Sequence, residues 1–232
     1  MRLQKYLASC GIASRRAAEQ IILDGRVSID GVTVTAMGVQ VKEGQDIRVD
    51  GKKALPEIEK CYIMYHKPAG EVTTTYDPEG RTTVMEHFTD FPVRLYPVGR
   101  LDYDSEGLLL LTNDGDLTMR MLHPSNQVWK GYLARVARQV TPEEVRRLQT
   151  GVIVDGKMTA RAICKVSPSQ PLDLLITIQE GRNRQVRKML EQVEHRVTKL
   201  QRVRFGPLRL GGLPRGRWRK LTENEKRALG VR

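Results

Sequence analysis

The longest apolar run in the chain is the block of four leucines at residues 108–111, inside the segment GLLLLT. A run of this length is far too short to span a membrane, but it is typical of a strand covered on both faces. The turn residues Asn113, Asp114 and Gly115 follow at once and end the strand. We therefore expect a fold built around a sheet that contains this segment.

Helical and strand-like segments are mixed along the rest of the chain. Helices are predicted over residues 3–10, 14–25, 116–124, 141–151, 182–193 and from residue 222 on. Strands are predicted over residues 27–34, 47–52, 61–68, 107–112, 128–136, 151–154, 160–166, 172–179 and 197–205. The mixture, without a glycine-rich phosphate loop, favours an α+β fold over a dinucleotide-binding fold.

The domain organisation follows from a polar, proline-marked segment near residue 55. Residues 1–52 combine two short helices with hairpin turns at Asp30-Gly31 and Asp50-Gly51, which is typical of a small binding module. Residues 53–60 are predicted as a linker, and residues 61–232 as a larger catalytic domain. The larger domain is expected to hold a mostly antiparallel, mixed sheet flanked by helices.

Basic residues gather in two regions of the sequence. The chain has 39 Lys and Arg against 27 Asp and Glu, a formal charge of +12. Bases dominate residues 182–220, and a second group lies near the start. Two separated, arginine-rich clusters fit a long phosphate backbone better than a small metabolite or a membrane. The candidates for phosphate contact are Arg2, Lys5, Arg15, Arg16, Arg26, Arg182 and Lys188.

Within this basic chain, residues 101–116 form an acidic island without a single Lys or Arg. Asp102 stands out because Arg100 precedes it by two positions, and a carboxylate beside arginine stays ionised, as a nucleophile or base must. The other acids of the island are expected to be turn and cap residues: Asp104, Glu106, Asp114 and Asp116. A hydrolase that uses Asp102 and Asp104 as paired carboxylates stays an alternative.

A metal site is not expected. The four histidines are scattered, with no His-x-x-x-His pair or nearby cysteine: His66, His87, His123 and His195. The island resembles a calcium loop only superficially, because an apolar strand follows where further oxygen ligands are needed. A Gly-x-Ser-x-Gly nucleophile elbow is also missing from the sequence.

Several segments, in order along the chain, resemble one enzyme family. GRLDYDSEGLLLLTNDG (residues 99–115) is similar to the signature of the rRNA pseudouridine synthases of the RsuA/RluB type. YHKPAGEVTTTYDPEGRTTV, EGRNRQVRKM and GLPRGRWRKLT resemble further segments of that family, the last most like its large-subunit members. The first fifty residues resemble the S-four-type RNA-binding domain. The resemblance thus covers nearly the whole chain.

The resemblance implies isomerisation of one uridine in ribosomal RNA to pseudouridine, without cofactor or metal. Asp102 would attack the ribose or remove a sugar proton, so that the glycosidic bond breaks and re-forms at carbon 5 of uracil. The target base would first leave its stack. Tyr132 would stack on it, and Arg187, or else Arg184, would be the basic partner of Asp102. The implied substrate-binding residues are Arg100, Leu101, Tyr132, Arg184, Gln185 and Arg187.

One position departs from the family pattern. The family has Lys-Thr-Tyr or similar, whereas this chain has Lys130-Gly131-Tyr132. We expect the glycine to leave the pocket without a side chain at this position. Because glycine weakens a strand, we also expect lower local rigidity.

The expected setting is a cytoplasmic monomer that acts on ribosomal RNA or a pre-ribosomal particle, and residues 1–11 hold no apolar signal-peptide core. Small-subunit rRNA as the target, or a non-catalytic ribosome-assembly role, are the alternatives.

Overall fold

The computed structural model describes residues 1–57 and 59–231. Ile58, inside the predicted linker, and Arg232, the last residue of the predicted catalytic domain, lie outside the described residues. The chain divides into two compact units. The N-terminal unit contains Met1–Cys61, Phe91–Leu95 and Asn113–Gly115, and the larger unit contains the remaining described residues.

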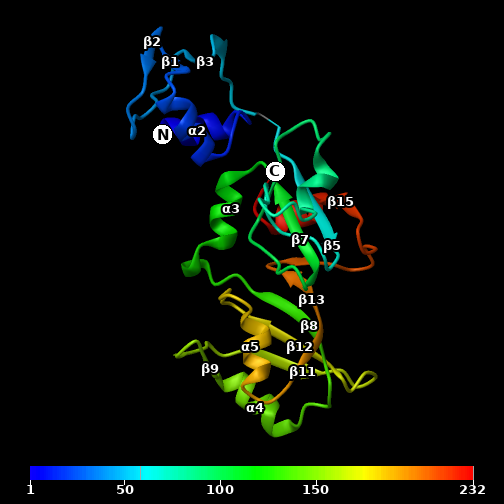
Figure 1. The fold of residues 1–232 in the computed structure, drawn as a ribbon. Helices are drawn as coiled ribbons and strands as arrows, with labels where there is room; N and C mark the ends of the chain where they lie inside the picture. Colours follow the sequence, from blue (N-terminus) through cyan, green and yellow to red (C-terminus); the bar gives the residue numbers. More distant parts are fainter. Residues whose placement is uncertain (58, 232) are drawn as a thin grey trace. The chain divides into compact units, whose positions relative to one another are not determined.

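The N-terminal unit combines two helices with a small antiparallel sheet of order β2-β1-β3-β4 (Figure 1). Its elements are α1 (Leu3–Ser9), α2 (Arg15–Leu23), β1 (Val27–Ile29), β2 (Val32–Val34), β3 (Ile47–Val49) and β4 (Lys52–Lys53). The side chain of Ser14 accepts a hydrogen bond from Ala17 N and caps α2, as predicted. Both predicted hairpins are confirmed, with Asp30 and Asp50 at positive φ in their turns.

An apolar cluster of both helices and the small sheet forms the core of the described part of this unit. Leu3 and Leu7 of α1 pack with Ile22 of α2 and with Ile47 of β3. Ala54, within the predicted linker, is only 3% exposed and belongs to the same cluster. The boundaries at residues 52 and 60 stay a prediction.

A mixed and mostly antiparallel sheet, with the strand order β11-β12-β8-β13-β7-β5-β15, organises the larger unit. Its strands are β5 (Tyr62–Lys67), β7 (Glu106–Thr112), β8 (Lys130–Val136), β11 (Ile163–Val166), β12 (Asp173–Ile178), β13 (Val197–Phe205) and β15 (Trp218–Lys220). Two short strands pair at its side, β6 (Tyr96–Pro97) with β7 and β14 (Leu208–Arg209) with β13. The β7–β13 pair is parallel. The leucines of β7 are fully buried at this centre, as predicted.

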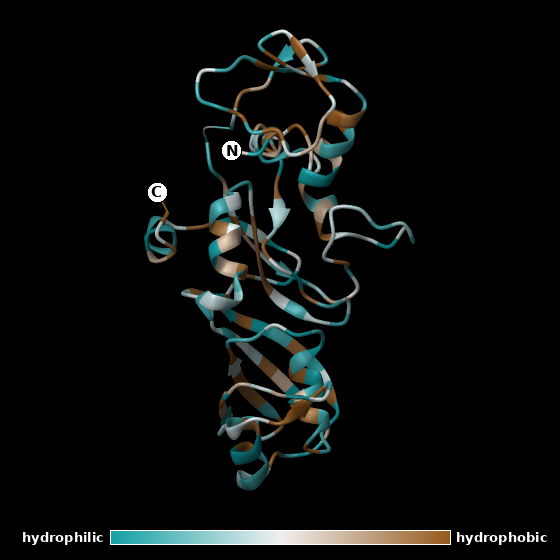
Figure 2. Ribbon diagram, turned by 90° about the vertical axis from the view of Figure 1, so that its left-hand side faces the viewer, coloured by the Kyte–Doolittle hydropathy of each residue, from teal (hydrophilic) through white to brown (hydrophobic). Residues whose placement is uncertain are grey.

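Helices cover this sheet. They are η1 (Val84–Phe88), α3 (Gly115–Leu122), η2 (Pro124–Asn126), α4 (Pro142–Thr150), α5 (Gln185–Glu191) and α6 (Glu223–Ala228). Apolar residues of α5, including Val186 and Met189, pack on Ala134 of β8 and Ile176 of β12. Figure 1 shows α5 beside these strands. In Figure 2 the helices carry both hydrophobic and hydrophilic colours, as expected of helices with one buried face.

Most predicted elements are confirmed, and the fold class is α+β as expected. The capping boxes at Thr141 and Thr222 are present. The helix predicted from residue 182 begins only at Gln185, because Arg184 adopts a left-handed conformation with φ 50°. The strand predicted over residues 151–154 is observed as β9 (Ile153–Val154), whereas its short hairpin partner β10 (Lys157–Met158) and the helix η1, which lack a periodic pattern, were not predicted.

Candidate active site

The acidic island begins in a loop that leads from β6 into β7 and carries Asp102. The backbone of this loop turns at Asp102, whose carbonyl oxygen accepts a hydrogen bond from Ser105 N at 3.0 Å. Thr73 fixes the preceding residue twice: its hydroxyl donates to Leu101 O at 2.8 Å and accepts from Leu101 N at 3.3 Å. The position of the Asp102 backbone is therefore set by contacts on both sides.

Lys67, at the end of β5, is the main internal support of the loop. Its ammonium group is fully buried and donates to Pro68 O at 2.9 Å, Asp102 O at 3.2 Å and Ser105 O at 2.9 Å. Burial lowers the pKa of Lys67 to about 8, although nearby carboxylates, Glu71 first and Asp102 next, oppose the shift. Three donors therefore meet three carbonyl oxygens only while this amine is protonated.

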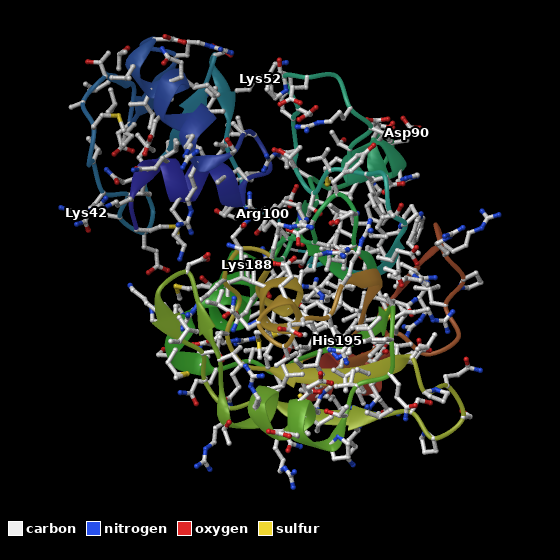
Figure 3. All side chains as sticks on the ribbon, turned by 60° about the horizontal axis from the view of Figure 1, so that its bottom comes forward. Lys42, Lys52, Asp90, Arg100, Lys188 and His195 are labelled. Atoms are coloured by element: carbon white, nitrogen blue, oxygen red, sulfur yellow. The ribbon has the colours of Figure 1, made fainter. Side chains whose placement is uncertain are left out.

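The Asp102 side chain is half-buried and lines a cleft of about 760 Å³ in the larger unit. Nothing among the described residues donates a hydrogen bond to its carboxylate or forms an ion pair with it. Arg100, labelled in Figure 3, is exposed and lines the same cleft. A carboxylate held by its backbone but unpartnered at its oxygens is free to react with a ligand.

The floor of the cleft comes from the sheet. Tyr132 of β8 is half-buried there, and its backbone pairs directly with Arg202 of β13. Leu101 also lines the cleft, although it is only 6% exposed. Gln185, at the start of α5, lines the cleft but donates its side-chain amide to Glu180 at 2.6 Å.

The basic helix meets the acidic loop, as expected, but through a different carboxylate. Arg184 donates from both terminal nitrogens to Asp104, each at 2.9 Å. Arg187 donates to Asp104 O at 2.9 Å and lies 3.2 Å from its carboxylate. The expectation that one of these arginines pairs with Asp102 is therefore wrong. The hydrogen bond from Arg184 holds the pKa of Asp104 below its ordinary value, against the effect of burial.

Of the acids expected to be turn or cap residues, Asp104 lies in a turn and also anchors the loop to α5, whereas Glu106 lies in a strand. Glu106 is the first residue of β7, only 7% exposed, and forms ion pairs with Lys199 and Arg215, each at 3.3 Å. The basic partners of Asp104 and Glu106 all come from distant segments of the chain. The spacing of the acids in the sequence therefore could not show which base each acid would bind.

Two of the predicted phosphate contacts make internal contacts in the larger unit. Arg182 donates to the β9–β10 hairpin, at Lys157 O and Met158 O, and to Glu180. Lys188, labelled in Figure 3, forms an ion pair with Asp155 of the same hairpin at 2.7 Å. Their role toward RNA stays a prediction.

In the N-terminal unit, Arg15 and Arg16 are exposed at the start of α2, and Arg2 is exposed before α1. Arg26 donates two hydrogen bonds to Asp50, at 2.9 and 2.6 Å. Lys5 is half-buried. Two positive side chains at one helix start oppose the helix dipole, and a bound phosphate would relieve that tension.

The position of Gly131 differs from the expectation. It does not line the cleft, and a Cβ there would lie 3.1 Å from Arg204 Cβ and 3.4 Å from Thr177 Oγ1. Neighbouring residues of a strand point to opposite faces, so a side chain at 131 would point away from Tyr132. The glycine therefore relieves packing against Arg204 and removes nothing from the pocket.

Sequence reasoning missed three residues that build the site: Lys67, Thr73 and Arg202. Lys67 could have been found from its place at the end of a largely apolar predicted strand. A charge buried at such a position needs several hydrogen-bond partners. Arg202 was counted within the basic cluster, but nothing in the sequence distinguishes it from its exposed neighbours.

No group of three His, Cys, Asp or Glu side chains in residues 1–57 and 59–231 is arranged to hold a metal ion. Among the helices of this described part, none is long and apolar enough to cross a membrane.

Comparisons with known proteins agree with the geometry. The family model for RNA pseudouridylate synthase matches residues 61–192, and that for the S4 domain matches residues 1–47. Ribosomal large subunit pseudouridine synthase B of Bacillus subtilis is 42% identical, over 98% of this chain and 95% of its own. The dual-specificity RNA pseudouridine synthase RluF of Escherichia coli is 39% identical, over 97% of this chain and 77% of its own. A crystal structure of a pseudouridylate synthase superposes with TM-score 0.72 and 31% identity, over 99% of both chains.

Proposed function

Since the chain belongs to the RNA pseudouridylate synthase family, whose members isomerise uridine to pseudouridine, we propose that its substrate is one uridine of large-subunit ribosomal RNA. The similarity to a large-subunit synthase over nearly the whole length of both chains supports this choice of RNA. The match of residues 1–47 to the S4 domain supports an RNA-binding role for the N-terminal unit.

Asp102 is the catalytic carboxylate of this proposal. One observation carries it: a half-buried carboxylate, without a partner among the described residues, lines a cleft whose other charged side chains are mainly basic. The target uridine leaves its stack and enters the cleft, where the ring of Tyr132 stacks on the base. Asp102 either attacks C1′ of the ribose or takes the proton from C2′, and in both cases the bond from C1′ to N1 breaks. The uracil then turns and rejoins through C5.

The other residues have supporting roles. Arg100 holds the adjoining phosphate or fills the space that the flipped base vacates. Arg184 and Arg187 act on the loop through Asp104, and Leu101 and Gln185 shape the cleft. Phosphate contacts along the RNA come from Arg2, Lys5, Arg15, Arg16, Arg26, Arg182 and Lys188.

We also propose the boundaries 1–52, 53–60 and 61–232 for the RNA-binding domain, the linker and the catalytic domain. The two family matches, at residues 1–47 and 61–192, support this division. The enzyme is proposed to act in the cytoplasm as a monomer and to need no cofactor or metal.

The test compares ribosomal RNA from cells with and without this protein. Pseudouridine has the same mass as uridine, so it is detected by carbodiimide labelling and primer extension. One large-subunit position should lose its signal without the protein and regain it when the wild-type chain, but not Asp102→Asn, is supplied. If the pseudouridine positions are the same with and without the protein, the proposal is refuted. If the position that loses its signal lies in small-subunit rRNA, the choice of large-subunit RNA is wrong.

A further inference from the structure

Two cations line the floor of the cleft without a carboxylate partner. Arg202 is only 2% exposed, and neither it nor the half-buried Lys130 forms an ion pair within the described part of the chain. The Lys130 ammonium donates to two backbone carbonyl oxygens, of Val128 at 3.1 Å and Gln179 at 3.0 Å. Burial, and then the charge of Arg202, lower the pKa of Lys130.

The guanidinium of Arg202 is held in place on one side and unsatisfied on the other. Its Nε donates to Leu108 O at 2.8 Å, and its Nη1 lies 3.5 Å from Arg100 O. Its central carbon lies 4.7 Å from the centre of the Phe205 ring, which lines the same cleft. Its Nη2 is buried, with no hydrogen-bond partner in the described residues. A buried N–H of a charged group without an acceptor is costly, so it indicates an acceptor that arrives with the ligand.

The position of Arg202 decides which part of the RNA this acceptor belongs to. Arg202 on β13 pairs directly with Tyr132 on β8, and paired residues share one face of a sheet. Arg202 therefore lies beside the ring that stacks on the flipped base. Its burial at the floor separates it from the mouth, where the charged RNA backbone stays in contact with water. The acceptor is thus a carbonyl oxygen of the base rather than a phosphate.

We propose that Arg202 is a catalytic residue whose Nη2 donates to a carbonyl oxygen of uracil and stabilises the charge that uracil gains when the glycosidic bond breaks. The inference rests on the proposed function. The electron pair of the bond from C1′ to N1 goes to uracil, where it is shared between N1 and the oxygens O2 and O4. The ribose is balanced by loss of the C2′ proton to Asp102 or by a new bond from Asp102 to C1′. When C5 attacks C1′, the bond from Asp102 to C1′ breaks, or C2′ regains its proton from Asp102, so that the carboxylate is restored. The proton of C5 then leaves and N1 becomes protonated.

A fixed cation at this position acts as an oxyanion hole does, because it meets the charge only as it develops and needs no reorganisation. Lys130 adds to the positive potential at the same end of the cleft. Both cations are preorganised by backbone carbonyl oxygens rather than by carboxylates, which would neutralise them.

The experiment combines each enzyme variant with each of several RNA substrates that differ at the target base. Single-turnover isomerisation rates at saturating enzyme, and RNA dissociation constants, are measured for the wild-type chain and Arg202→Gln. The RNA carries uridine, 2-thiouridine or 4-thiouridine at the target, because sulfur accepts a hydrogen bond more weakly than oxygen. Arg209→Gln is the matched control, because Arg209 is an exposed arginine of the neighbouring strand β14.

We expect Arg202→Gln to lower the rate with uridine by about 10²–10³-fold, as when one oxyanion-hole donor is removed, with an unchanged dissociation constant. One thio analogue should slow the wild-type and Arg209→Gln chains but have no further effect on Arg202→Gln. Equal slowing of wild type and Arg202→Gln by both analogues, or a weaker dissociation constant at an unchanged rate, would overturn the proposal.

The role of Arg202 can be tested even if Arg202→Gln misfolds. The wild-type chain, measured with both thio analogues, tests whether a carbonyl oxygen of uracil accepts a hydrogen bond during the reaction. If neither thio analogue slows the wild-type chain, uracil receives no donor of this kind and the inference fails. A wild-type chain that isomerises no uridine in any RNA refutes the proposed function instead, so the two failures are distinguishable.

Discussion

Arg184 binds both carboxylate oxygens of Asp104 through its two terminal nitrogens, each at 2.9 Å, two positions after the proposed catalytic residue. This pair joins the start of α5 to the loop, and Arg187 reinforces it at the Asp104 carbonyl oxygen. The basic helix thus acts on Asp102 through the backbone of its neighbour. The carboxylate oxygens of Asp102 have no partner among the described residues, which is what the proposed reaction with the ribose requires.

Loss of this anchor should slow catalysis without abolishing it. We expect Asp104→Asn to lower kcat by up to about 100-fold, because a small displacement of a reacting group is that costly. The measurement is a steady-state assay of isomerisation that separates kcat from KM. Asp104→Glu, which keeps the charge, should recover part of the rate. The control is Glu43→Gln, an exposed acid of the N-terminal unit that should leave the rate unchanged. An unchanged kcat in Asp104→Asn would show that the ion pair does not position the loop.

Removal of the Asp102 carboxylate should have a much larger effect. Asn keeps the size and the backbone contacts of the residue, but it can neither attack C1′ nor accept the C2′ proton. We expect the isomerisation rate of Asp102→Asn to fall by about 10⁴-fold or more, the upper end for a positioned general base. RNA affinity, measured by filter binding, should stay near that of the wild type. Residual activity comparable with that of Asp104→Asn would assign the chemistry to another group.

Lys67 should make catalysis sensitive to alkaline pH. As the pH rises through its pKa of about 8, Lys67 becomes neutral, keeps two N–H donors for three carbonyl oxygens, and holds the Asp102 loop less firmly. We expect kcat to fall above pH of about 8. The Lys67→Met variant should be slow at every pH and lack this inflection.

Folding stability should change in the opposite direction over the same range. The pKa of Lys67 is lowered on folding from 10.5 to about 8, so between these values the unfolded chain binds more protons than the folded chain. The contribution of Lys67 to the free energy of unfolding therefore rises with pH across this window. Denaturant titrations of the wild type and Lys67→Met at several pH values isolate the effect. A fall in kcat accompanied by an equal loss of folded protein would contradict the role in the loop.

The sequence predicts local structure in this chain better than it predicts side-chain partners. Hairpins at Asp30 and Asp50 and the capping box at Thr141 follow from contacts a few residues apart, and all are observed. The pairing of Arg184 with Asp104 joins residues 80 positions apart. It depends on the left-handed conformation of Arg184, which no local pattern indicates. The resemblance of the motifs predicted that the acidic loop and the basic helix meet. Which carboxylate of the loop, Asp102 or Asp104, binds the arginines could be seen only in the tertiary structure.

Gly107 shows how closely strand packing and the cleft are linked. Its φ of +111° lies in a region that disfavours other residues, and a Cβ there would collide with the backbone of Arg202, reaching 2.6 Å from its nitrogen. This contact lies within the parallel pairing of β7 and β13 that brings the Arg202 side chain to Leu108 O. A side chain at position 107 would push the two strands apart.

We therefore expect Gly107→Ala to lower the free energy of unfolding by about 2–5 kcal/mol, from backbone strain and overpacking together. Gly211→Ala is the matched control: its φ is +58° and its Cβ would meet no atom within 4 Å, so it reports backbone strain alone, about 1–2 kcal/mol. Urea titration of both variants measures the difference. The folded fraction of Gly107→Ala should also isomerise RNA more slowly than that of Gly211→Ala, because displaced strands move Arg202 away from the base. Equal losses of stability in the two variants would mean that β7 and β13 tolerate the added methyl group, and the close approach would then have no role in building the cleft.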